Sequence, residues 1–517
     1  TSSNNRFTSY QISFLILMDS SQNDDSVSQQ QINEKSTINT QSSTNKTDVN
    51  KENNENEAVI TFPKGQVEVM EVDEFEDNSK VPHLSFWKIY LLFLNFGFHA
   101  WGGPVAQIAL IKERLVIKDQ WITPARFNRV YGVFQILPGP EATELCMFFG
   151  FLAGRGRIGG FLGGLGFVTP GFLLILLFSF IYVKVGLKNI YFNASFRALQ
   201  PIVAAMVLRA VHKIGDHSFI SSRDRKFNYL LFGLAILSAI QTVVNLNFFI
   251  TLGVCGIAYM FLDRKMYWPG ILVFVLEFIG FGVYVGFRGL PSKYSIATGV
   301  GKETDPGHIF GLGLIAGSLS FGGAYTTIPF LQVEAVMIGK WMAKQTFLDA
   351  IAIGQILPSP LVMFSTFIGY YGGWVYGNGN HAWAFLNATL ISIGILTPCF
   401  FFTILGHHAL EKLVRNKFLA AFFDGISASV VGIIAITALD LLNFSVTTTA
   451  MIDNLPPEKK DLVAAQHSSI AAILYVLSLA TLYTFKRPTT SLVLVIFGAI
   501  AGQYLFVVNE NGERLEL

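Results

Sequence analysis

Cysteine and charge are scarce in this sequence of 517 residues. It has only three cysteines, Cys146, Cys255 and Cys399, and each lies within an apolar stretch. Their spacing fits neither a disulfide framework nor a zinc site, so we interpret them as packing residues. Charged residues make up 14% of the chain and hydrophobic residues 51%, whereas soluble domains carry about 25% charged residues. This balance argues against an ordinary soluble enzyme.

The sequence also lacks the motifs of ATP-driven and hydrolytic proteins. It contains no P-loop, no Ser/His/Asp arrangement and no spacing typical of a metal cluster. We therefore expect no catalytic residue, no cofactor, no metal and no nucleic-acid partner. A membrane-embedded enzyme is a remote alternative.

Acidic charge is concentrated at the N-terminus. Residues 1–80 carry 6 Lys or Arg and 14 Asp or Glu, and the rest of the chain carries 31 and 21. Residues 19–80 are polar and almost lack aromatics, so they cannot bury enough apolar surface to offset the entropy of ordering. We predict a disordered polar and acidic tail over residues 1–80. The apolar run before Met18 is too short for a signal peptide, and Met18 is a candidate translation start.

Long apolar stretches dominate the chain from residue 84 onward. A hydrocarbon core about 30 Å thick needs about 20 apolar residues in helical form. One uncharged run, at residues 227–262, is long enough for two short helices, so the total is about 13 spans or half-spans. We predict an all-α, multi-pass integral membrane protein. The stretches are residues 89–111, 130–154, 158–183, 194–211, 227–262, 266–287, 308–333, 350–376, 382–406, 418–439, 467–485 and 490–508.

The two halves of the chain resemble each other. Shifting the sequence by 220 residues gives 12 identities in the 44 pairs that begin at position 97, where random matching would give about three. The matches include Gly-Gly at 102–103 and 322–323 and Pro-x-Pro at 138–140 and 358–360. We therefore predict two homologous repeats, and repeats of this kind are typical of transporters.

Helix parity predicts that the repeats are inverted. We divide the chain into a tail at 1–80, a first repeat at 81–262, a linker with an extra span at 263–305, a second repeat at 306–508 and a C-terminal tail at 509–517. Six crossings followed by the extra span reverse the orientation of the second repeat. This inference requires residues 194–211 to cross the membrane, although that stretch contains Arg197 and Arg209. From residue 209 onward, the distribution of Lys and Arg weakly favours a cytoplasmic N-terminal tail, in a plasma or organelle membrane.

The repeated glycines and prolines mark the candidate substrate site. Proline interrupts helical hydrogen bonding, and lipid tolerates such a break only where it faces protein or a wet cavity. Helices that restart there would aim N–H groups and positive dipole ends at the centre, which suits an anion. Simple kinks or close helix contacts are the alternative. The candidate substrate-binding residues are Gly102, Gly103, Pro104, Gln135, Pro138, Gly139, Pro140, Thr143, Gly322, Gly323, Gln355, Pro358, Ser359 and Pro360, with Arg126 as a candidate cation.

Glu141 and Glu144 are the candidate proton-coupling residues. They follow the first Pro-x-Pro and lie three residues apart, on neighbouring positions of one helical face. A carboxylate at membrane depth is costly, which makes it a functional hypothesis. Protonation of such a group would favour a nearby anion, so the two ligands would be linked. Alternatively, Glu141 merely complements a helix N-terminus.

The same residues resemble the chromate ion transporter (CHR) family, two-domain long-chain type. Residues 98–108 and 135–145 are similar to the family's Phe-Gly-Gly-Pro start and its Gln-Leu-Leu-Pro-Gly-Pro-x-Ala-Thr-Glu-Leu run, and residues 320–325 and 328–331 are similar to its C-terminal domain. The resemblance implies transport of chromate, with sulfate as its mimic, by halves in opposite orientations. Departures include Trp101, where the family usually has Phe, and Glu141, where it commonly has a neutral polar residue.

Together these observations predict a secondary active transporter of tetrahedral oxyanions, coupled to protons, with the substrate bound between the inverted repeats. An anion channel of the same architecture is the alternative. The sequence leaves open whether the protein forms a homodimer.

Overall fold

The computed structural model describes residues 78–101, 103–135, 137–186, 189–219, 227–289, 298–320, 326–406, 417–447, 457–485 and 490–507. These residues all belong to one unit, Val72–Leu517. Almost all of the predicted acidic tail, with Met18, lies outside the described residues. Gly102, Gly322 and Gly323 lie outside them too.

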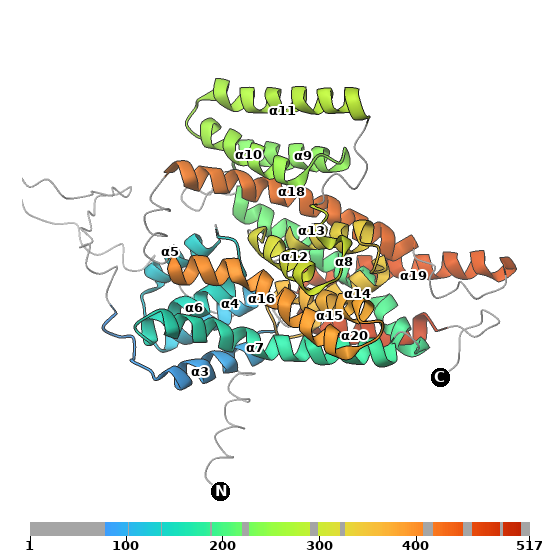
Figure 1. The fold of residues 1–517 in the computed structure, drawn as a ribbon, viewed down its shortest axis with the longest axis horizontal. Coiled ribbons are helices and arrows are strands. Elements are labelled where there is room, and N and C mark those ends of the chain that lie inside the picture. The colour runs from blue at the N-terminus through green and yellow to red at the C-terminus, as the bar shows by residue number, and fades with distance from the viewer. Residues whose placement is uncertain are drawn as a thin grey trace, which may run out of the picture. The chain divides into compact units, whose positions relative to one another are not determined.

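The first half of the chain forms helices of very different lengths (Figure 1). They are α3 (Phe86–Phe98), α4 (Pro104–Ile111), the π-helical η2 (Lys112–Lys118), α5 (Pro124–Phe134), α6 (Glu141–Ala153), α7 (Arg157–Ile181), η3 (Tyr182–Gly186), α8 (Ile190–Phe219), α9 (Tyr229–Val243), α10 (Phe248–Leu262) and α11 (Tyr267–Arg288).

The second half repeats much of this order. Its elements are η4 (Val300–Lys302), α12 (Pro306–Ser318), α13 (Thr327–Gln332), the π-helical η6 (Val333–Ile338), α14 (Lys344–Ile356), η7 (Leu361–Met363), α15 (Phe364–Tyr376), α16 (His381–Leu405), α18 (Lys417–Thr447), α19 (Pro457–Thr484) and α20 (Thr490–Leu505). The described residues thus contain seventeen α-helices, and the all-α prediction is confirmed.

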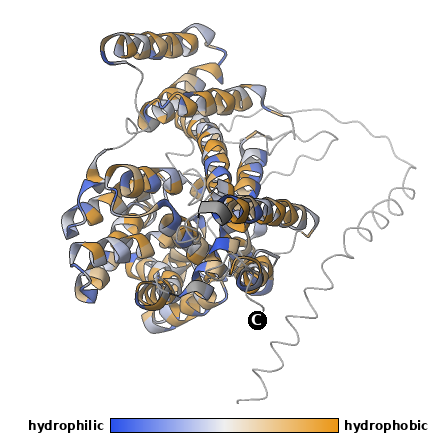
Figure 2. Ribbon diagram, turned by 90° about the vertical axis from the view of Figure 1, so that its right-hand side faces the viewer, coloured by the Kyte–Doolittle hydropathy of each residue, from blue (hydrophilic) through white to orange (hydrophobic). Residues whose placement is uncertain are grey.

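Six helices are long and apolar enough to cross a membrane. They include Tyr191–Asp216, which covers the weakly hydrophobic stretch with Arg197, and Tyr267–Arg288, the extra span before the second half. Five shorter apolar helices accompany them. Figure 2 shows hydrophobic residues on the outer sides of the helices as well as between them. Trp268 and Phe287 of α11 are 86% and 87% exposed, as suits side chains that face lipid.

Local chemistry explains where several helices begin. Asn228 caps α9 by accepting the N–H groups of Leu230 and Leu231, because its short side chain satisfies donors that lack an intrahelical carbonyl. Asn247 caps α10 in the same way, and Asn245 makes the turn between the two helices at φ +59°. The uncharged run at 227–262 is therefore two short helices, as predicted.

Four predicted spans are each divided between two described elements. α3 ends at Phe98 and α4 begins at Pro104, after Gly103 at φ +81°. α5 ends at Phe134 and α6 begins at Glu141. The second half has matching gaps between α12 and α13 and between α14 and η7. Helices therefore end and restart near all four positions, as the sequence predicts.

The long helices α7 and α16 each pack against two helices of their own half. α3 and α6 pack against α7, and α12 and α15 pack against α16. A Cβ atom on Gly97 of α3 would lie 2.4 Å from the Phe167 carbonyl oxygen, and one on Gly317 of α12 would lie 2.3 Å from that of Ile395. Glycine is needed at both positions because the backbones of the paired helices touch.

Peripheral helices cross between the halves. α9 and α10 of the first half pack on α18 of the second, and α19 and α20 of the second half pack on α8 of the first. Figure 1 shows α18 beside α9 and α10, with α11 beyond them. The long helices α8 and α18 also pack against each other, so neither half completes its packing alone.

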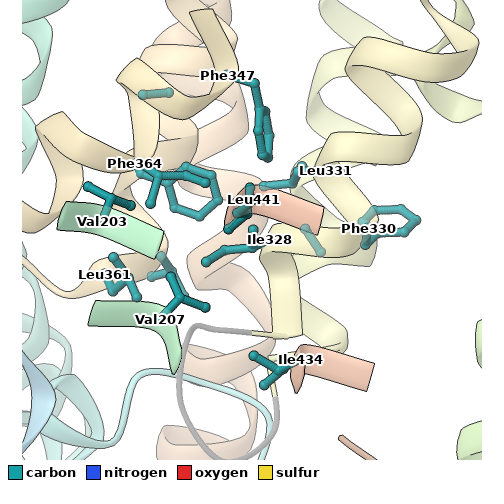
Figure 3. Close-up of a cluster of buried hydrophobic side chains, with 14 of the residues drawn as sticks. Val203, Val207, Ile328, Phe330, Leu331, Phe347, Leu361, Phe364, Ile434 and Leu441 are labelled. Atoms are coloured by element: carbon teal, nitrogen blue, oxygen red, sulfur yellow. The ribbon is translucent and has the colours of Figure 1, made fainter. Parts of the chain in front are cut away.

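One hydrophobic cluster lies where the two halves meet, and another is formed by residues of the first half. Phe347, Phe364, Ile328 and Leu361 are at most 3% exposed. Figure 3 shows these side chains gathered with residues of α8 and α18. The labelled residues are Val203, Val207, Ile328, Phe330, Leu331, Phe347, Leu361, Phe364, Ile434 and Leu441.

A buried carboxylate fixes the segment before α12. Glu334 of η6 is fully buried and accepts the backbone N–H groups of Thr298, Gly299 and Gly301 at 2.6, 3.2 and 2.8 Å. These charge-assisted bonds offset the cost of burying the acid. Glu334 therefore acts as a structural anchor.

Candidate functional site

Gln107 joins the first break of the first half to the second break of the second half. Its side chain, on α4, is 1% exposed. The amide nitrogen Nε2 donates to the carbonyl oxygen of Ala100 at 3.0 Å and to that of Ser359 at 2.9 Å. Both carbonyls lie where a helix is interrupted and have lost their helical N–H partner. The Gln107 amide replaces that partner as the hydrogen-bond donor.

Gly139 makes the reciprocal connection. Its N–H, in the Pro-Gly-Pro of the first half, donates at 3.0 Å to the carbonyl oxygen of Ser320. Ser320 follows α12 at the first break of the second half. The first break of each half therefore lies against the second break of the other, although Gln107 and Ser359 are 252 positions apart in sequence.

Long helices close around these breaks. A Cβ atom on Gly139 would lie 2.7 Å from Cβ of Cys399, in α16. A Cβ atom on Gly171, in α7, would lie 2.2 Å from Cβ of Ser359. Both glycines are therefore required by space, and each sits next to the proline-containing turn of a helix, Pro398 or Pro170.

The two carboxyl groups lie at the start of α6 and are buried. Glu144 is fully buried, and Thr403 of α16 donates to its Oε1 at 3.5 Å. Its Oε2 has no hydrogen-bond partner within the described ranges. Glu141 is 8% exposed and its Oε2 accepts from the Tyr131 hydroxyl at 3.4 Å. Oε1 of Glu144 would lie 2.9 Å from a Cβ on Gly139, so this acid borders the break itself.

Several other buried polar atoms at the breaks lack a partner among the described residues. They include Oγ1 of Thr143, Oγ of Ser359 and Nε2 of Gln355, three residues that the sequence predicted. Oγ of Ser365, in the first turn of α15, and Nε2 of Gln332, at the end of α13, also lack a partner among the described residues and were not predicted. A buried polar atom without a partner is costly, so these atoms are available to a ligand or water.

Comparison with known proteins identifies the family. A family model described as chromate transporter matches residues 87–260 and, a second time, residues 308–503. The chain belongs to the chromate transporter family. The double match makes it a two-domain, long-chain member, a transporter rather than an enzyme.

Curated relatives extend over most of this chromate transporter. It is 36% identical to the chromate transport protein of Pseudomonas aeruginosa over 425 residues, which cover 82% of this chain and 94% of that protein. It is 26% identical to the chromate transport protein of Cupriavidus metallidurans, with 68% and 82% covered. An uncharacterized transporter of Methanocaldococcus jannaschii is 27% identical, with 67% and 82% covered. No solved structure matches.

Two other predicted residues of this chromate transporter, Arg126 and Gln135, lie away from the breaks or at their edge. Arg126 donates from Nη1 to Oδ1 of Asn78 at 2.9 Å and lies 6.0 Å from the Phe148 ring, so it contacts the segment before α3. Gln135 ends α5, where its backbone N–H bonds to Tyr131. Pro138, Pro140, Pro358 and Pro360 lie within the breaks, and Pro104 is the first residue of α4.

Sequence reasoning missed two features of this chromate transporter. Gln107 lies in the run that carried the family resemblance, and a lone glutamine in an apolar half-helix was an available signal. Asp349 of α14, 1% exposed, fell between two charge-free stretches. Arg197, which Gln200 links to Asp349 by hydrogen bonds, was considered only because its charge lowers the hydrophobicity of a predicted span.

Proposed function

We propose that this member of the chromate transporter family is a secondary active carrier of a tetrahedral oxyanion, chromate or its mimic sulfate. The substrate binds where the four helix breaks meet, between two inverted repeats, and its movement is coupled to protons. The observation that supports this proposal most directly is a pair of hydrogen bonds, from Gln107 and from Gly139, that each join a break of one half to a break of the other.

The inverted arrangement is supported by the repeated order of elements. Sequence matches, the double family match, the paired π-helices and the glycine contacts of α3 and α12 all point to two related halves. α11 adds one crossing between them, so parity reverses the second half. The exchange of peripheral helices between α8 and α18 suits halves related by a twofold axis in the membrane plane.

Anion recognition follows from the chemistry of the breaks. The first N–H groups of α6 have no preceding helical carbonyl and carry the positive end of the helix dipole. Thr143 and Gln355 add side-chain donors that lack described partners. A tetrahedral oxyanion offers several acceptor oxygens, so it can bond to donors from both breaks at once.

Proton coupling rests on Glu144 and Glu141. Two ionised carboxylates would repel a dianion bound at Gly139, whereas their neutral forms would not. Proton and anion binding therefore favour each other, and movement of both together is symport. The full burial of Glu144 favours a carrier over an anion channel, which needs no such group.

The test is flux of chromate and sulfate into proteoliposomes, with and without an imposed pH gradient. We expect saturable uptake, with accumulation rising about tenfold per pH unit for each proton coupled. Flux that does not saturate would identify a channel. Absence of flux for both anions would refute the proposed substrate class.

A further inference from the structure

Arg197 is a buried cation near the start of a candidate membrane span, Tyr191–Asp216. It lies on α8, is 1% exposed, and is the only Lys or Arg among the buried side chains of the described residues. An unpaired charge at this depth would be very costly, so burial on this scale requires specific partners.

The Arg197 side chain bonds to residues of α8 and α18, and Gln200 extends the network to Asp349 of α14. The Arg197 guanidinium donates from Nη1 to Oε1 of Gln200 at 3.2 Å and to the carbonyl oxygen of Ser445 in α18. Nε2 of Gln200 donates to Oδ1 of Asp349 at 3.3 Å, and the Tyr182 hydroxyl donates to Oδ2 at 2.7 Å. Gln200 thus links a buried cation of the first half to a buried anion of the second.

One member of this network lies on the helix that leads into the Pro-x-Pro break of the second half. Asp349 is on α14, which ends at Ile356 immediately before that break. Further along α8, Val203 and Val207 lie close to Leu361, which follows the break (Figure 3). α8 also contains Pro201, which lacks the N–H that would bond to the Arg197 carbonyl. The helical ladder is therefore interrupted at the cation.

We propose that Arg197 is the cation that meets the oxyanion during transport, and that Asp349 is its counter-ion when no substrate is bound. The inference rests on the proposed function and assigns a residue to it. A planar guanidinium can donate two parallel bonds to a tetrahedral oxyanion. The substrate and Asp349 then compete for one positive charge, and Gln200 and Tyr182 hold the carboxylate when it is displaced.

The test compares chromate and sulfate flux and thermal unfolding for the wild type, Arg197→Gln, Asp349→Asn and the double variant. Arg197→Gln should raise KM about ten- to a hundredfold, the loss expected for a charge-assisted hydrogen bond. Asp349→Asn should lower KM several-fold because the competitor is gone. The double variant should regain the unfolding temperature lost in Arg197→Gln, since neither charge is left unpaired, but its KM should stay high. Arg209→Gln, the same change elsewhere on α8, is the control.

A purely structural role predicts the opposite for the double variant. If its KM returns to the wild-type value together with its stability, the inference is wrong. Arg197→Lys keeps the charge and tests the case in which the neutral variants do not fold. It should raise KM because an ammonium group lacks the planar fork, and a wild-type KM would overturn the assignment. A wild-type protein that carries neither anion would instead refute the proposed function.

Discussion

Gly171→Ala is the sharpest test of the contact between α7 and the second break. Gly171 follows Pro170 in α7 and lies against Ser359. The new methyl group would lie 2.2 Å from Cβ and 2.9 Å from Cα of Ser359, and 3.0 Å from the carbonyl oxygen of Pro358. Ordinary contacts of this kind are 3.4–4 Å. Relief therefore requires movement of more than about 1 Å, and two of the three neighbours are backbone atoms.

The expected magnitude follows from this overlap. Overpacking of a well-packed core costs about 1–3 kcal/mol. If the break moves rather than the helix, the same free energy appears as a loss of substrate binding of about five- to 150-fold. Because Ser359 also receives the Gln107 bond, the displacement would disturb the connection between the two halves.

The assay is saturable chromate flux in proteoliposomes together with the thermal unfolding temperature of the purified protein. Gly253→Ala is the matched control. It lies within α10, and a Cβ there has no neighbour within 4 Å, so alanine should leave flux unchanged and stabilise the helix by up to about 1 kcal/mol. Wild-type KM, maximal rate and stability in Gly171→Ala would refute the inference that α7 holds the second break in its working position.

Three further predictions address separate parts of the fold. Glu144→Gln should abolish the response of flux to a pH gradient because the amide cannot carry the coupling proton. The control Glu113→Gln, at an exposed ion pair, should leave that response unchanged. A retained response in Glu144→Gln would exclude Glu144 from coupling. Gln107→Leu should raise the KM for chromate about five- to 150-fold, because the carbonyl groups of Ala100 and Ser359 lose their donor. An unchanged KM would show that the Gln107 side chain does not order the site. Glu334→Gln should lower the unfolding temperature but leave the KM unchanged, because the backbone N–H groups that Glu334 binds do not belong to the breaks. A KM change without loss of stability would contradict that assignment.

Much of the local architecture was predictable. Pro138 and Pro358 lack a backbone donor and each lies two residues before a second proline, which favours a break there, whereas the single Pro170 and Pro398 lie inside α7 and α16. The two halves could be aligned because Gly-Gly and Pro-x-Pro recur at one spacing. Glu141 and Glu144 stood out because ionisable groups are rare in apolar helices, and the structure buries both. Arg126 was predicted from charge alone, and its contact with Asn78 depends on a segment that no local pattern connects to it.

The amino-acid sequence by itself determined the helical class and the two segments that match the family. These properties depend on backbone donors, apolar length and residue identity, which act over a few neighbours. Only the tertiary structure decided which interruption meets which. Gln107 and Ser359 lie 252 positions apart, and Gln200 and Asp349 lie 149 apart. Such pairs form because the packing of whole helices brings them together, and the free energy of that packing is summed over many weak contacts that no single motif records.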